Sequence, residues 1–278
     1  MSNIKWSNIF KGFAMGTSDL VPGISGGTIA LLLGIYNDFI RAISGLFSKH
    51  FVASIRFLIP IGLGMVLAIG SLSKLINYLL SEFHIPTMFF FTGLIIGIIP
   101  FLLKSANFIA TFSIKHYLLL ILGIAIILII SSLSGEESVN NSHFTLDFGL
   151  IIKYFLAGMC ASSAMLLPGI SGSFMLLVFG VYGTIMFAIS EFVSFNFAAI
   201  PLLITVGCGV IFGFMFSSKL IQYLLSQHTI TTYALIIGLV IGSLYAVFPG
   251  IPTHGLEWLI SLIVLCIGVF ISQKLSSE

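Results

Sequence analysis

The pentapeptide Pro-Gly-Ile-Ser-Gly occurs twice in the chain, at 22–26 and at 168–172. A proline followed by glycines is a poor helix interior, so each copy predicts a short non-helical tip between two helices. The glycines leave backbone N–H groups accessible, and the helix after each tip directs the positive end of its dipole at them. The residue types and their spacing therefore predict a site for an anion such as a phosphate group.

Hydroxyl groups around both tips add further hydrogen-bond donors. The residues expected to bind the phosphate are Ser25, Gly26, Gly27 and Thr28 at the first tip and Ser171, Gly172 and Ser173 at the second. The alternative is a purely structural motif, in which glycine permits close helix approach and serine caps a helix. The duplication favours the binding site. A nucleotide-binding phosphate loop is excluded, because the lysine of that motif is missing.

Asp19 lies three residues before Pro22, and its counterpart 146 residues later is Met165. An unpaired carboxylate inside a membrane is costly unless it takes up a proton or finds a donor. We therefore predict that Asp19 either carries a proton during the reaction cycle or caps the tip and the helix that follows it. The sequence leaves both alternatives open.

Lys74 and Lys219 occupy matching positions of two near-identical nonapeptides, SKLINYLLS at 73–81 and SKLIQYLLS at 218–226. We predict that these lysines attract the phosphate; the alternative is that each side chain only reaches the nearest membrane interface. The histidines show no HxxxH or HExxH spacing, and we predict neither a metal nor a cofactor.

These polar residues are exceptions in an apolar chain. Of its 278 residues, 58% are hydrophobic and 7% are charged, whereas soluble domains carry about 25% charged residues. The mean hydropathy is +1.19. No polar stretch is long enough for a soluble catalytic domain, and nucleic-acid binding is equally a poor interpretation. The expected fold class is an all-α polytopic membrane protein.

The duplicated motifs divide the chain into two homologous halves, 1–133 and 150–278, with an external linker at 134–149. Each half contains a broken segment, expected to form two short helices, and three apolar segments able to cross a hydrocarbon core of about 30 Å. The broken segments are 7–40 and 151–190, and the transmembrane segments are 57–80, 87–103, 117–133, 199–225, 232–248 and 257–272.

The placement of lysine and arginine predicts the topology. If the broken segments fold back as re-entrant hairpins, the cytoplasmic side holds Lys5, Lys11, Arg41, Lys49, Arg56, Lys104, Lys115 and Lys274, and the outer side holds Lys153. If they cross the membrane, this bias largely disappears. We therefore predict re-entrant hairpins, cytoplasmic N- and C-termini and halves of inverted orientation, which is a plan typical of secondary transporters.

The segment KGFAMGTSDLVPGISGGT at 11–28, with LGIY at 33–36, resembles the bacterial polyprenyl-phosphate transporter family, and the similarity covers nearly the whole chain. The resemblance implies a flippase for undecaprenyl phosphate, the carrier lipid of cell-wall peptidoglycan synthesis. It implies movement from the outer to the inner leaflet of the bacterial cytoplasmic membrane, and no enzymatic activity. The head group would lie near the two tips. Proton coupling and the oligomeric state stay open.

Two alternatives remain at this point. Undecaprenyl-diphosphate phosphatases of the BacA type also have inverted repeats, re-entrant hairpins and a Pro-Gly-x-Ser-Arg-Ser-Gly signature. Here Gly26 and Gly172 stand where that signature has its arginine, so a residue suited to hold the diphosphate is missing. The second alternative is a secondary transporter of a small anion, which the same tips would suit.

Overall fold

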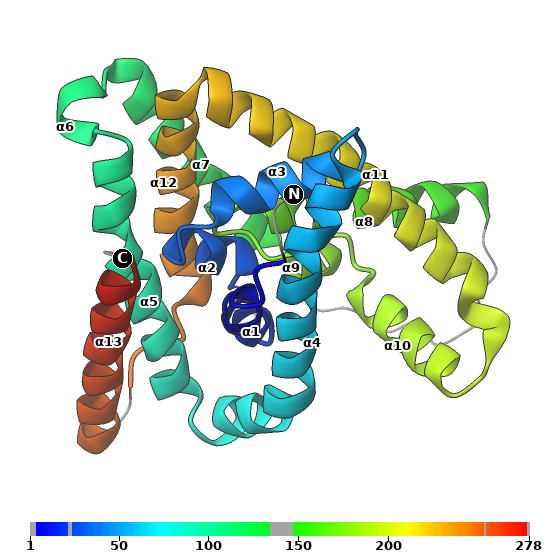
Figure 1. The fold of residues 1–278 in the computed structure, drawn as a ribbon. Helices are drawn as coiled ribbons and strands as arrows, with labels where there is room; N and C mark the ends of the chain where they lie inside the picture. Colours follow the sequence, from blue (N-terminus) through cyan, green and yellow to red (C-terminus); the bar gives the residue numbers. More distant parts are fainter. Residues whose placement is uncertain (1–3, 22–23, 134–146, 253, 277–278) are drawn as a thin grey trace.

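The computed structural model describes residues 4–21, 24–133, 147–252 and 254–276, and within these ranges all regular structure is helical (Figure 1). Most of the predicted linker, 134–146, lies outside the described residues. Seven of the described helices are long and apolar enough to cross a membrane: α4 (Phe51–Glu82), α5 (His84–Ser105), α7 (Ile114–Leu133), α8 (Phe148–Leu166), α11 (Ile200–Gln227), α12 (Thr229–Val247) and α13 (Gly255–Ser276). The chain is an all-α, multi-pass membrane protein.

The broken segments contain three helices each, where the sequence predicts two. The first comprises α1 (Asn8–Asp19), α2 (Gly26–Leu32) and α3 (Tyr36–Gly45). The second comprises α8, α9 (Gly172–Val178) and α10 (Tyr182–Val193). The additional breaks lie at Gly34 and Gly180, whose φ angles of 66° and 60° are left-handed and favour glycine.

The opening helices of the two halves differ in length. α1 has 12 residues, whereas α8 has 19 and is by length and composition able to span the membrane. α9 and α10 then meet at an angle of 114°, as in a broken span or a re-entrant loop. Two short connecting elements, α6 (Phe108–Thr111) and η1 (Phe197–Ala199), complete the fold.

Helix packing is reciprocal between the halves. α1 packs on α4 as α8 packs on α11, and α5 packs on α13 as α12 packs on α7 (Figure 1). Small residues permit these close approaches. A Cβ atom at Gly93 or Gly97 on α5 would meet α13, and one at the counterparts Gly238 or Gly242 on α12 would meet α7. The third apolar helix of each half therefore covers the second apolar helix of the other half.

The main hydrophobic core lies where the halves meet. It includes fully buried side chains of α5 and α12, such as Ile98, Leu102, Ile236 and Ile237, together with most of α2. α5 and α12 also pack on each other. This core holds the first tip and its short helix against the second half.

Candidate functional site

The two predicted tips lie against each other. Tyr36, at the start of α3, donates its hydroxyl to the carbonyl oxygen of Leu166 across 2.9 Å, and both groups are buried. The backbone N–H of Gly169 donates to Thr28 Oγ1, also at 2.9 Å. These bonds join residues 130 and 141 positions apart in the chain. The two tip regions therefore contribute hydrogen bonds to the contact between the halves.

The first tip is closed by groups of its own half. Asp19 Oδ1 accepts a hydrogen bond of 2.8 Å from the backbone N–H of Gly26. Ser25 is the N-cap of α2, and its Oγ accepts from the N–H of Gly27 at 3.2 Å. The backbone amides of Gly26 and Gly27 thus both have partners. Pro22 and Gly23 lie outside the described residues.

Asp19 combines features of both predicted roles. Its Oδ1 contacts a tip amide, as a capping carboxylate does. Its Oδ2 is buried and has no hydrogen-bond partner among the described residues. A Cβ atom at Gly26 would lie 3.0 Å from Oδ1 and 3.1 Å from Oδ2, so the glycine makes room for the carboxylate. The carboxylate therefore occupies the place in which we expected an external anion.

The second tip is more open. Ser171 precedes α9 but makes no capping bond; its Oγ lies 2.8 Å from Ser173 Oγ. Ser171 is buried, Gly172 is partly buried and Ser173 is exposed. Two hydroxyl groups that pair with each other at a partly open position can turn to an incoming phosphate without breaking the helix.

Lys74 and Lys219 are both exposed, on α4 and α11. Within the described part of the chain, no hydrogen bond or ion pair joins either lysine to a tip residue. The tyrosines four residues later repeat the same environment: Tyr78 packs edge-to-face on Phe83 and Tyr223 on His228. The two copies of the nonapeptide therefore lie in similar exposed surroundings, and their lysines make no described bond to the tips.

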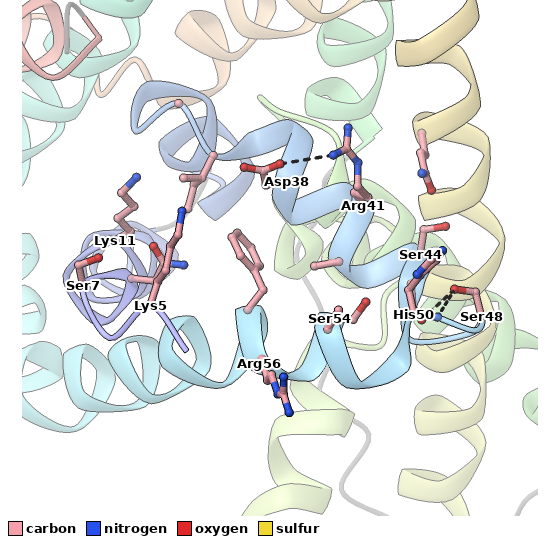
Figure 2. A pocket seen from close by; sticks show the side chains of 18 residues that line it. Lys5, Ser7, Lys11, Asp38, Arg41, Ser44, Ser48, His50, Ser54 and Arg56 are labelled. Atoms are coloured by element: carbon pink, nitrogen blue, oxygen red, sulfur yellow. Dashed lines mark hydrogen bonds and ion pairs between the residues drawn. The ribbon is translucent and has the colours of Figure 1, made fainter. Parts of the chain in front are cut away.

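A cavity of about 930 Å³ lies at the other end of α1 and was not predicted (Figure 2). It is formed by the start of α1, the break between α2 and α3, α3 and the start of α4. The charged side chains that line it are Lys5, Lys11, Arg41, Arg56 and one carboxylate, Asp38. In the sequence these four cations had indicated the topology alone. The residues 146 positions later are apolar: Ile151, Ala157, Phe187 and Leu202. This difference in charge between the halves was the sequence signal that could have indicated the basic cavity.

Comparison with known proteins gives consistent results. Residues 15–261 match the VCA0040-like family, described as undecaprenyl phosphate translocase-like. The chain is similar to the polyprenyl-phosphate transporter of Staphylococcus aureus (strain NCTC 8325 / PS 47), with 63% identity over 99% of this chain and 97% of that protein. It is 31% identical to the polyprenyl-phosphate transporter of Vibrio cholerae serotype O1 (strain ATCC 39315 / El Tor Inaba N16961), over 91% of this chain and 80% of that protein. No solved structure matches the chain.

Proposed function

The chain belongs to the undecaprenyl phosphate translocase-like family, a family of transporters and not of enzymes, and we propose that it moves undecaprenyl phosphate between membrane leaflets. The direction we propose is from the outer to the inner leaflet of the bacterial cytoplasmic membrane. The carrier lipid then becomes available again for cell-wall peptidoglycan synthesis. The names of both relatives support a polyprenyl phosphate as the substrate.

The observation that carries this proposal is the contact between the duplicated tips. Buried hydroxyl, amide and carboxylate groups gather there between otherwise apolar helices. Non-helical backbone at membrane depth is tolerated where it is buried in protein or lines a polar cavity. A single phosphate would find its donors at the tips, and its polyprenyl chain would lie along the apolar outer faces of the helices.

We propose that Asp19 controls access to the first tip. While its carboxylate holds the Gly26 amide, a phosphate meets a competing negative charge instead of a free donor. Coulomb repulsion at short range is strong where water is excluded. Uptake of a proton by Asp19 would remove that charge, and the unpartnered Oδ2 is the oxygen available to receive it. This arrangement would couple lipid movement to protons.

The remaining predicted residues have more peripheral proposed roles. Ser171, Gly172 and Ser173 would receive the head group at the more open second tip. Lys74 and Lys219 would act as attracting charges on the exposed surfaces of α4 and α11, without contacting the tips in this state. Neither lysine is needed to complete the hydrogen bonds of the closed first tip.

The proposed topology places both termini in the cytoplasm and makes the two halves inverted. Impermeant thiol reagents test it in a cysteine-free background. A cysteine at the exposed Ser48 should react only from the inside, and one at the exposed Phe148 only from the outside. Ser138, in the predicted outer linker, lies outside the described residues. Labelling of position 48 from outside intact cells would contradict the topology.

The function is tested most simply in cells. A reagent that recognises the phosphate of undecaprenyl phosphate is applied to cells that express the protein and to cells that lack it. We expect more exposed carrier lipid on the outer surface without the protein, and restoration by the wild type. Equal exposure in both strains, with the protein present in the membrane, would contradict the proposed direction and substrate.

A further inference from the structure

The cavity at the base of the first hairpin carries an excess of positive charge. Lys5 and Lys11 come from the N-terminal side of α1, and Arg41 and Arg56 from α3 and α4 (Figure 2). Asp38 neutralises part of this charge, since its Oδ1 lies 3.9 Å from Arg41 Nη1, and both of these side chains are exposed. A concave surface lined by charges of one sign focuses the electric field and concentrates ions of the opposite sign.

A buried donor without a partner points to the same ligand chemistry. Asn8 lines the cavity and is 4% exposed, and its Nδ2 has no hydrogen-bond partner among the described residues. Buried polar groups in folded proteins are rarely left unpaired. An amide N–H pair beside two lysines lacks an acceptor, and an anionic oxygen would supply it.

The cavity also contacts the end of the short helix that follows the first tip. Lys11 Nζ lies 3.5 Å from the carbonyl oxygen of Leu33, at the end of α2, and Gly34 in the break between α2 and α3 lines the cavity. An anion in the cavity would compete with this carbonyl for Lys11. Occupancy of the cavity would therefore loosen one contact that fixes the first hairpin.

The position of the cavity along α1 separates it from the tips. Asn8 and Asp19 lie at opposite ends of this helix. At 1.5 Å per residue they are about 16 Å apart along the axis, roughly half of a 30 Å hydrocarbon core. The corresponding base of the second hairpin has the apolar residues Ile151 and Ala157 where the first has Lys5 and Lys11.

We propose that this cavity is a second phosphate site, which holds the phosphomonoester head group of the lipid substrate at one membrane face before or after it passes the tips. The proposal rests on the proposed function for the identity of the lipid. Because the positions in the second half that correspond to Lys5, Lys11, Arg41 and Arg56 hold apolar residues, head groups would be retained preferentially on one side. The same donor set would also accept inorganic phosphate, and the test distinguishes the two sources.

The test measures equilibrium binding to purified protein in nanodiscs of neutral phosphatidylcholine, which removes anionic bilayer lipids as competitors. The probes are farnesyl phosphate, as a soluble polyprenyl monophosphate, and inorganic phosphate. The variants are Lys5→Gln/Lys11→Gln and, separately, Asn8→Asp, which puts a negative charge where the free donor is. The matched control is Lys104→Gln/Lys115→Gln, which removes two cations predicted for the same membrane face but absent from the cavity lining.

We expect each cavity variant to weaken binding by on the order of tenfold, because charge-assisted hydrogen bonds are lost. The control should bind like the wild type, and Lys11→Arg should retain binding. Tighter binding of farnesyl phosphate than of inorganic phosphate would identify the lipid head group as the occupant, and the reverse order would identify free phosphate. Thermal unfolding in detergent verifies that the variants fold. Should Asn8→Asp not fold, the lysine pair still decides, since Lys5 is exposed and Lys11 is only partly buried.

Unchanged binding in the folded cavity variants, or an equal loss in the control, would overturn the second site. Lipid transfer by the wild type in liposomes separates this failure from failure of the proposed function. If the wild type transfers the lipid and the cavity variants bind phosphate normally, only the proposal of a second phosphate site is refuted. A wild-type protein that transfers no polyprenyl phosphate refutes the function on which the cavity proposal rests.

Discussion

The two broken hairpins share a pentapeptide but differ in their surroundings. All seven residues of α2 are buried, whereas none of the residues of α9 is. α3 packs on both α4 and α11, while α10 contacts α9, η1 and α11 and extends away from the helices of the first half (Figure 1). The first tip is closed by Asp19, and the second retains an exposed Ser173.

This difference shows that one local sequence is compatible with a closed and an open arrangement. The free energies of the two arrangements must then depend on tertiary contacts, because the pentapeptides are identical. Transporters with repeated halves use such pairs of arrangements to expose one central site to opposite sides in turn. We expect that exchange of the two arrangements, with the second hairpin closed and the first open, gives the other state of the cycle.

The largest effect is expected from Gly26→Val. The Cβ of the new side chain would lie 3.0 Å from Asp19 Oδ1, and its branches would push the carboxylate off the Gly26 amide. Lipid transfer in liposomes should be lost. Adding Asp19→Ala should restore thermal stability, because it removes the clashing group.

The matched variant at the other tip is Gly172→Val, whose Cβ would meet the backbone oxygen of Ala161 at 2.9 Å. No side-chain deletion relieves a clash with backbone, so Asp19→Ala should not rescue this variant. Equal rescue of both variants would show that Asp19 does not distinguish the two tips.

Thr28→Val should have the next largest effect. It removes the acceptor of the buried Gly169 N–H and costs about 1–3 kcal/mol of stability. Thr28→Ser keeps the hydroxyl and serves as the control. The counterpart in the second half is Phe174, which makes no such bond, so Phe174→Leu should change thermal unfolding much less. A comparable loss in both variants would argue against the tip contact as a stabilising element.

Asp19→Asn should change the coupling of lipid transfer to protons more than the binding of lipid phosphate. The asparagine can still accept from the Gly26 N–H, but it can no longer release a proton. We expect lipid phosphate binding to persist and the response of transfer to an imposed pH gradient to disappear. Glu82→Gln, at an exposed carboxylate at the end of α4 and outside the cavity lining, should keep the response. A wild-type gradient response in Asp19→Asn would make Asp19 a structural cap.

The smallest effects are expected at the second breaks, where the hairpins are alike. Gly34 and Gly180 have left-handed φ angles, and a Cβ atom at either position would meet nothing within 4 Å. Replacement by alanine should therefore cost only the backbone strain, about 1–2 kcal/mol, at both positions. Unequal losses in thermal unfolding would show that the two hairpins differ at their breaks as well as at their tips.

Sequence reasoning succeeded where a feature was duplicated or strongly apolar. The repeated motifs identified the tips that meet in the structure, and the apolar segments identified six long helices. The breaks at Gly34 and Gly180 had a signal in the sequence, because Gly-x-Tyr occurs at 34–36 and again at 180–182. A glycine inside an apolar run does not by itself predict a left-handed residue.

Other features depend on tertiary contacts. Helices such as α7 and α13 are apolar on every face, so periodicity does not reveal which partner each one chooses. The bond from Gly26 to Asp19 depends on side-chain geometry across seven residues. The basic cavity combines residues from 5 to 57 with Gln222 of α11, and only folding brings them together.

The most direct test of the account is leaflet exchange of undecaprenyl phosphate in liposomes that contain the purified protein. A membrane-impermeant reagent reports the fraction of lipid phosphate on the outer surface over time. The account predicts rapid exchange with the wild type, exchange at the rate of protein-free liposomes with Gly26→Val, and no phosphate release from undecaprenyl diphosphate. Exchange by folded wild-type protein no faster than in protein-free liposomes, with or without a pH gradient, would contradict it.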